Sequence, residues 1–278
     1  MSISYLKIQK KPQIFLRLFG VSVEQFETIL AKVSPEWQSR VVSSYKRPGR
    51  PYDLELEDMV LMLLLYYRSY ITQEFVGYLF DLHKSGVCRI IQRLEPILAK
   101  IMAISKARKL SKEEVEQLLI DATEQPIERP KKGQKPYYSG KKKRHTMKTQ
   151  IAITRKGRIV DVSKPTPGSV HDFTVFKQGE PLPPDSTAFV DSGYQGIDKL
   201  HPAAEFPYKE TKEKPLSKEE KEYNHALSRI RVKVENVLGQ IKVFRILSDR
   251  YRNKRKRYGI KFNIIAGIVN LKNGFANA

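Results

Sequence analysis

A long basic window, residues 129–158, restricts the folds open to this chain more than any other feature of its sequence. It contains twelve Lys or Arg residues and no acidic residue. A second window, residues 250–257, has six basic residues in eight and again no acid. Like charges repel each other, so folding these residues together requires a counter-charge, and the phosphate backbone of a nucleic acid is the obvious one. A solvated flexible loop would have a similar composition, so both interpretations stay open at this point.

The overall composition favours a polyanionic partner and excludes several classes of protein. The chain of 278 residues has 51 Lys and Arg against 30 Asp and Glu, a net charge of +21, and the two windows hold 18 of these charges. A single cysteine excludes a disulfide scaffold. No stretch reaches the roughly 18 to 20 apolar residues of a membrane span, and the N-terminus lacks the apolar region of a secretory signal. We therefore expect a protein that acts away from membranes.

Helical periodicity dominates the first hundred residues. Residues 22–33 place apolar side chains at helical spacing behind a Ser22 cap, and Pro35 is expected to end that helix. The basic, Pro- and Gly-rich segment 46–53 predicts a linker. Further helices are expected at residues 56–70, 72–80, 85–94 and 97–104.

Two of these helices have the lengths and the short connecting turn of a helix-turn-helix. The turn is residues 81–84, Ser85 caps the second helix, and Pro96 separates that helix from the next. Cys88, which has apolar neighbours, is expected to be a small buried thiol. In such a motif the second helix enters the major groove of DNA, and an ordinary three-helix packing module is the alternative. The outward residues, all able to donate hydrogen bonds, would be Lys84, Ser85, Arg89, Gln92 and Arg93.

The rest of the chain indicates a mixture of strands and helices. Residues 118–123 predict a short apolar strand that ends in a carboxylate, Asp121, and a strand of four to five residues precedes Asp191. Two strands joined by a turn at residues 155–157 predict a hairpin. Helices are expected from Ser169 and from Ser217, where Glu220 completes a capping box. The hairpin strands are expected at 148–154 and 158–163, and one more strand at 205–210.

Three carboxylates stand out in this pattern. Asp121 and Asp191 each follow an apolar strand, and Glu235 flanks the apolar stripe of the long helix four residues after Arg231. An ionised carboxylate at a buried strand end is costly unless it is paired or binds a metal. Carboxylate oxygens suit Mg²⁺ or Mn²⁺, and two such ions about 3.5 to 4 Å apart can promote phosphodiester cleavage. Taken singly, each acid has a simpler interpretation: an ion pair of Asp121 with Lys148 or Arg144, a turn at Asp191, and an ion pair of Glu235 with Arg231.

Several longer segments together resemble one family, the DDE transposases of bacterial insertion sequences, most closely the insertion-sequence-five-like group. The resemblance extends over about residues 15–270, and its segments occur in the family's order. The most specific of them are YSGKKKRHTMK and PGSVHD. The others are GRPYDLELEDMVLMLLLYYR, ITQEFVGYLFDLHKSGVCRIIQRLEPIL, IDATEQPIERPKK, VDSGYQGI and RIRVKVENVLGQIK.

The resemblance implies a ribonuclease H-like α/β fold, a mixed five-stranded sheet with flanking helices, preceded by an all-α helix-turn-helix domain. It also implies a catalytic, metal-binding triad of Asp121, Asp191 and Glu235, on the first strand, the fourth strand and the following helix. Asp121 would bridge two Mg²⁺ or Mn²⁺ ions and the other two acids would bind one each, for DNA strand cleavage and strand transfer.

Further residues of this chain match the family's motifs. A basic group would bind DNA: Lys141, Lys142, Lys143, Arg144, His145 and Lys148. Arg231 fits a Tyr–Arg–Glu pattern of related transposases and would hold a phosphate oxygen, although Ser228 occupies the Tyr position. Glu124, His171 and Asp172 are possible supporting residues of the metal site. For Glu124 the alternative is an ion pair with Arg129, and for Asp172 it is a helix N-terminal interaction.

These observations predict three regions: an N-terminal helical arm (1–44), a helix-turn-helix DNA-binding domain (45–105) and a ribonuclease H-like catalytic domain with a basic C-terminal extension (106–278). The implied partners are double-stranded DNA, as the element's terminal inverted repeats and as target, and further copies of the chain in a homodimer or higher oligomer. The expected location is the bacterial cytoplasm, at the nucleoid. The alternatives are a domesticated DNA-binding protein that does not cut, and a ribonuclease H-fold nuclease without strand transfer.

Overall fold

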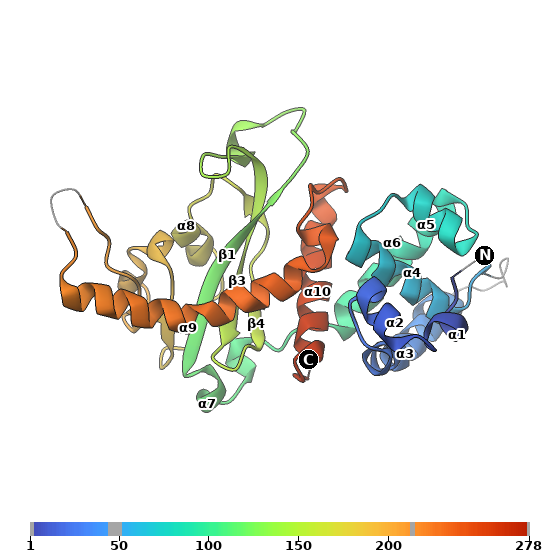
Figure 1. Ribbon diagram of the computed structural model, residues 1–278, viewed down its shortest axis with the longest axis horizontal. Coiled ribbons are helices and arrows are strands. Elements are labelled where there is room, and N and C mark those ends of the chain that lie inside the picture. Colours follow the sequence, from blue (N-terminus) through green and yellow to red (C-terminus); the bar gives the residue numbers. More distant parts are fainter. Residues whose placement is uncertain (1–2, 44–51, 212–214, 277–278) are drawn as a thin grey trace. The chain divides into compact units, whose positions relative to one another are not determined.

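The computed structural model describes residues 3–43, 52–211 and 215–276 (Figure 1). The predicted linker at 46–53 lies almost entirely outside these residues. None of the described helices is both long enough and apolar enough to cross a lipid bilayer.

The described residues form two compact units. The helical unit comprises the residues up to Ala103 together with Lys242–Asp249 and those from Ile260 onward. The sheet unit comprises Ile104–Ile241 and Arg250–Gly259. In its last forty residues the chain therefore passes from one unit to the other three times.

The helical unit is built around a buried helix. Its α4 buries nine consecutive residues, Met59 to Tyr67, and a helix that is apolar on all sides is stable only when other helices surround it. This confirms the helix predicted at 56–70. The helices of this unit are α1 (Tyr5–Ile8), α2 (Pro12–Phe19), α3 (Val23–Trp37), α4 (Leu56–Ser69), α5 (Gln73–Phe80), α6 (Lys84–Ile101) and α10 (Tyr258–Lys272), which begins in the sheet unit.

The prediction that Pro35 ends the first long helix was wrong. Ser22 caps α3 as expected, in a capping box with Gln25, but the helix continues through Pro35 to Trp37 and into a π-helical turn, Gln38–Val42. A proline inside a helix removes one backbone donor. Here its ring lies on the exposed side, and the burial of Trp37 holds the chain in helical conformation beyond it.

The helix-turn-helix is present, with a longer second helix than predicted. Thr72 caps α5, as expected, by accepting a hydrogen bond from the Phe75 backbone. The cap of α6 is His83 rather than Ser85, because the His83 ring accepts from the Ser85 backbone. Pro96 lies within α6 and does not separate two helices, since apolar side chains on both sides of it continue one buried face.

The sheet unit contains the mixed sheet that the resemblance implies. Five strands follow the order β4-β3-β1-β6-β7, and the two-residue strands β2 (Tyr138–Ser139) and β5 (Thr166–Pro167) also pair with β3. β1 and β3 are antiparallel, as are β3 and β4, whereas β6 is parallel to β1 and to β7. The bounds of the five are β1 (Gln117–Pro126), β3 (Arg144–Thr154), β4 (Ile159–Val162), β6 (Thr187–Phe189) and β7 (Ala204–Glu205).

The central strands are longer than their apolar stretches. β1 pairs with β3 from Leu118↔Thr154 to Pro126↔Thr146, so Asp121 lies in the middle of the strand and not at its end. The backbone ladder continues because β3 supplies hydrogen-bonding partners along its whole length. The strand predicted at 205–210 is reduced to β7.

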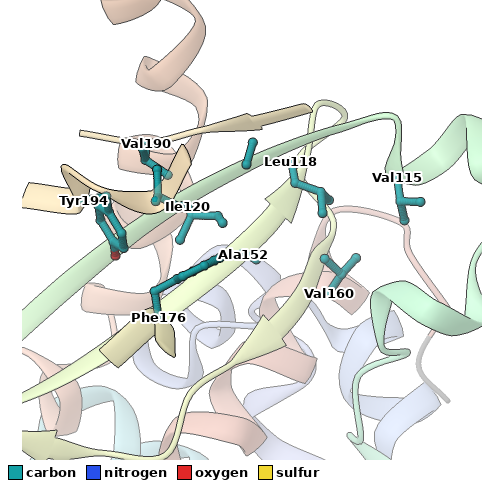
Figure 2. Packing of buried hydrophobic residues seen from close by; sticks show 10 residues of the cluster. Val115, Leu118, Ile120, Ala152, Val160, Phe176, Val190 and Tyr194 are labelled. Carbon is teal, nitrogen blue, oxygen red and sulfur yellow. The ribbon is translucent and has the colours of Figure 1, made fainter. Parts of the chain in front are cut away.

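Helices cover both faces of the sheet. On one face Leu118 and Ile120 of β1 pack with Phe176 of α8 (Asp172–Lys177) in the core drawn in Figure 2. The helix predicted from Ser169 thus begins only at Asp172. The opposite face meets α9 (Lys218–Lys242), which crosses the sheet in Figure 1 and begins with the predicted capping box, in which Ser217 and Glu220 exchange hydrogen bonds.

Candidate active site

Asp121 lies where β1 loses its neighbour on one side. The last residue of β1 that pairs with β6 is Leu119, so the backbone edge beside Asp121 is open. The side chain is 17% exposed, and burial, opposed by the positive charge of Arg231, raises its pKa from 3.8 to about 6. Arg231 Nη2 is 3.8 Å from Asp121 Oδ1, which also accepts a hydrogen bond from the Ala122 backbone. A buried carboxylate with one distant cation is well suited to take up a further positive charge.

Asp191 lies beside Asp121, just beyond the end of β6. It caps a short 3-10 turn, Ser192–Tyr194, and its Oδ1 accepts a hydrogen bond from the Gly193 backbone at 2.8 Å. Asp191 therefore stabilises a turn, which was the simpler interpretation of this residue from the sequence. Its negative charge also contributes to the raised pKa of Asp121. The turn fixes the Asp191 carboxylate relative to the sheet.

Tyr194 is a member of this site that sequence reasoning missed. Its ring is fully buried in the core of Figure 2, and among the described residues its hydroxyl has no hydrogen-bond partner. Burial raises its pKa well above 10, and the negative charges of Asp172, Asp121 and Asp191 add to that effect. Tyr194 thus lies within electrostatic range of three carboxylates. Its only signal in the sequence was an aromatic residue in the turn after Asp191.

A buried lysine connects the next two acids. Lys148 Nζ is 2.7 Å from Asp172 Oδ1 and 3.7 Å from Glu124 Oε1, and it donates to the Val170 carbonyl at 2.6 Å. The Lys148 side chain is 8% exposed, unlike the lysines before it in the basic motif. Glu124 also accepts a hydrogen bond from Thr146. Two of the supporting acids therefore belong to one network with Lys148, whereas His171 is exposed at the start of α8.

Glu235 is placed differently from the other acids. It lies on α9 one turn after Arg231, and it is exposed whereas Arg231 is largely buried. Within the described ranges, no three His, Cys, Asp or Glu side chains lie close enough together to hold an ion. The structure thus places Arg231 beside Asp121, and Asp172 and Asp191 on either side of Gly193, and it does not show Glu235 joined to them.

The donor set nevertheless fits a divalent cation. Asp121 and Asp191 supply hard carboxylate oxygens, the ligands that Mg²⁺ and Mn²⁺ prefer. Their mutual repulsion, seen in the raised pKa of Asp121, is the kind that a bound cation relieves.

The two basic windows meet at the far end of β1. The Tyr251 backbone donates to the Pro126 carbonyl at 2.8 Å, and Tyr251 forms a parallel bridge with Ile127. The Arg255 guanidinium lies 4.3 Å from the centre of the Tyr137 ring, a cation–π contact. The basic surface, as we name it, consists of the exposed Lys and Arg residues of 129–144 and 250–257. It includes the predicted DNA-binding residues Lys141, Lys142, Lys143 and Arg144, with His145 half-buried against Tyr138.

Comparisons with known proteins account for both units. Residues 52–103 match the family model described as the helix-turn-helix of DDE superfamily endonuclease, and residues 120–270 match DDE superfamily endonuclease. A protein of Microchaete diplosiphon, named as a transposase for insertion sequence element IS702, is 40% identical over 274 residues, which are 95% of this chain and 98% of the relative. The chain belongs to the transposases of insertion sequences. A second relative, named as a transposase for element IS112 of Streptomyces albus G, is 27% identical over 83% of this chain and 84% of its own length.

The transposase presents most of the predicted base-reading residues on α6. Lys84, Ser85, Arg89 and Gln92 are exposed, and the Lys84 ammonium is 3.4 Å from the Glu74 carboxylate. Arg93 is only partly exposed. It donates to the Tyr52 hydroxyl, and its guanidinium lies over the Tyr52 ring.

The expectation that Cys88 is buried was wrong. The thiol is partly exposed and accepts a hydrogen bond from Gln92 at 3.2 Å. Cys88 follows Val87, which is buried, so it lies at the edge of the face that α6 turns toward the core.

Proposed function

We propose that this transposase binds the ends of its own insertion element and catalyses divalent-metal-dependent strand cleavage followed by strand transfer. The observation that carries the proposal is the pair of carboxylates Asp121 and Asp191, which neighbouring strands hold beside each other where the edge of β1 is open. A nearby arginine, and a basic surface at the far end of β1, support a substrate that is a polyanion.

In this proposal Asp121, Asp191 and Glu235 would hold two Mg²⁺ or Mn²⁺ ions. The bound ions would supply an activated water for cleavage, an activated 3′-hydroxyl for joining, and stabilisation of the leaving oxygen. The exposed Glu235 side chain has to turn toward Asp121 to join the other two acids. Arg231 would leave Asp121 and hold a phosphate oxygen of the substrate, because its planar guanidinium suits such a contact.

Two surfaces divide the work of binding DNA. The exposed N-terminal residues of α6 would read bases in the major groove of the element ends, through Lys84, Ser85 and Arg89. The basic surface would track the phosphate backbone of element and target DNA and supply most of the affinity. Because two element ends must be brought together, the active form would be a homodimer or a higher oligomer, and its place of action would be the nucleoid.

A cleavage and joining assay tests the proposal. The full chain is incubated with Mg²⁺ or Mn²⁺ and labelled duplexes that carry the element ends. We expect nicks at the ends and joined products, and their loss in Asp121→Asn and Asp191→Asn. As a matched control, Asp198→Asn removes an exposed acid of the same unit and leaves both products unchanged.

The assay separates the alternatives by their products. Binding without nicks at correct ends would mean a domesticated DNA-binding protein, and nicks without joining would mean a nuclease. Nicking that persists in Asp121→Asn would overturn the assignment of the active site.

A further inference from the structure

The sequence around Lys148 is typical of a DNA-binding segment, but in the structure the Lys148 side chain is buried. It lies within the basic motif, yet its side chain is 8% exposed whereas the preceding residues of the motif, Lys141 to Arg144, are all exposed. A lysine that binds phosphate needs its ammonium at the surface. An ammonium at this depth is stable only with acceptors around it, and Lys148 has them in the Val170 carbonyl and the carboxylates of Asp172 and Glu124.

The ammonium of Lys148 holds only one oxygen of Asp172. Asp172 Oδ1 is 2.7 Å from Lys148 Nζ. The other oxygen points toward the turn after β6: a Cβ placed on Gly193 would be 2.7 Å from Asp172 Oδ2 and 2.9 Å from Asp191 Oδ1. Both carboxylates therefore approach the same small volume, which is open only because residue 193 has no side chain.

The charges around this volume do not balance. The negative charges of Asp172, Asp121 and Asp191 all act on the buried Tyr194 hydroxyl. Among the described side chains, the nearby cations are Lys148, which is shared between Asp172 and Glu124, and Arg231, which is 3.8 Å from Asp121. These three carboxylates therefore have less than two full positive charges beside them, and a divalent cation would supply the missing charge. The buried Tyr194 hydroxyl is a second, independent sign of an absent polar partner here, since among the described residues it has none.

We propose that Asp172 is a fourth carboxylate of the divalent-ion site, acting beside Asp191, and that Lys148 is its positioning residue. Lys148 fixes one oxygen of Asp172 and so directs the other toward the ion. This inference rests on the proposed metal-dependent function and extends its three-acid site. It assigns Lys148 to the metal site and not to the DNA-binding surface.

Mn²⁺ binding to the full chain without DNA, measured by calorimetric titration, tests the assignment. Asp172→Asn removes the charge and keeps the size of the side chain, and we expect it to weaken Mn²⁺ binding about tenfold or more. Lys148→Met removes the contact that positions Asp172 and also a positive charge that repels the ion, so its effect is judged from the double variant. If Lys148 acts only through Asp172, the double variant binds Mn²⁺ no more weakly than Asp172→Asn alone. The control Asp198→Asn should match the wild type.

DNA affinity in EDTA is the second measurement. A positioning role predicts that Lys148→Met binds DNA like the wild type, with the same salt dependence. A weaker dependence on salt would show a lost phosphate contact and overturn the role of Lys148. Wild-type Mn²⁺ affinity in Asp172→Asn would overturn the proposal, and this variant alone decides it should Lys148→Met not fold.

The two proposals fail in different ways. If Asp121→Asn binds Mn²⁺ as tightly as the wild type, the metal site of the proposed function itself is wrong. If Asp121→Asn loses Mn²⁺ and Asp172→Asn retains it, only the fourth carboxylate is wrong.

Discussion

At the scale of single residues, Asp121 couples the stability of the fold to pH. Its pKa is raised from 3.8 to about 6, mainly by burial, so the folded chain binds a proton more tightly than the unfolded chain. Ionisation above pH 6 therefore opposes folding, and this effect disappears as the pH falls toward 4. In EDTA at pH 8 we expect Asp121→Asn to be more stable than the wild type by about 2 to 3 kcal/mol.

Denaturant unfolding at a series of pH values checks this expectation. The difference between the two proteins should shrink between pH 6 and pH 4. With Mn²⁺ present it should reverse, because only the wild type retains the full carboxylate set. Equal stability of the two proteins at pH 8 in EDTA would contradict the burial of an ionised Asp121.

Gly193 is a second residue whose replacement has a definite expected result. In Gly193→Ala the new methyl group would lie under 3 Å from oxygens of both Asp172 and Asp191, so one or both carboxylates must move. We expect cleavage to fall at least about tenfold, since small displacements in an active site have large effects on rate. Gly239→Ala on α9 is the control, because its methyl group meets nothing within 4 Å and a helix gains up to about 1 kcal/mol from this change. Equal losses in both variants would point to a general effect on folding.

At this scale the sequence identifies some site residues and not others, for a physical reason. Asp121 and Asp191 each follow a short apolar run, and that local pattern is readable from the sequence. The pairing of Lys148 with Asp172 joins a strand to a helix, and the position of Lys148 in a basic run predicts exposure. Only the pairing of β1 with β3 shows that its side chain points inward, beside Glu124.

At the scale of elements, the basic surface and α6 should make separable contributions to DNA binding. Replacing Lys141, Lys142 and Lys143 by Ala removes up to three phosphate contacts, so log Kobs should fall less steeply with log salt, by up to about 3. Affinity for element ends and for unrelated DNA should fall alike. Arg89→Ala should weaken binding to the ends by about 1 to 3 kcal/mol and leave unrelated DNA nearly unaffected.

Fluorescence anisotropy over a range of salt concentrations distinguishes these two effects. If the triple variant lost affinity for the element ends alone, the basic surface would be reading sequence, contrary to its assignment. If Arg89→Ala changed both DNAs equally, α6 would not be the recognition helix.

The ends of the helices and strands show where tertiary packing overrides the preference of the local sequence. The prolines at 35 and 96 predicted helix ends, yet both lie inside helices whose buried residues continue on either side. The apolar run 118–120 predicted a short strand, whereas pairing with β3 extends β1 to Pro126. The capping box at Ser217 and the Thr72 cap were correct, because a cap depends only on residues within one turn of helix.

At the scale of the whole molecule, α10 completes the helical unit through a buried ion pair. Lys261 Nζ is 2.7 Å from Glu95 Oε1, which also accepts from the Tyr67 hydroxyl at 2.9 Å, and all three side chains are buried. Lys261→Met removes the ammonium that pairs with the buried Glu95 carboxylate and should cost about 3 to 5 kcal/mol. A second change, Glu95→Leu, should restore most of that stability. Denaturant unfolding measures both effects, and additive losses in the double variant would refute the coupling.

The distribution of each unit along the chain has a consequence for synthesis in the cell. A ribosome makes α4, α5 and α6 first, then the entire sheet, and only afterwards α10, whose Lys261 pairs with Glu95 in the interior of the helical unit. Until α10 is made, Glu95 lacks the ammonium of Lys261, so the buried network of the helical unit is incomplete while the sheet unit is synthesised. The unit that contains the helix-turn-helix is thus completed only after the unit that contains the candidate active site has been made.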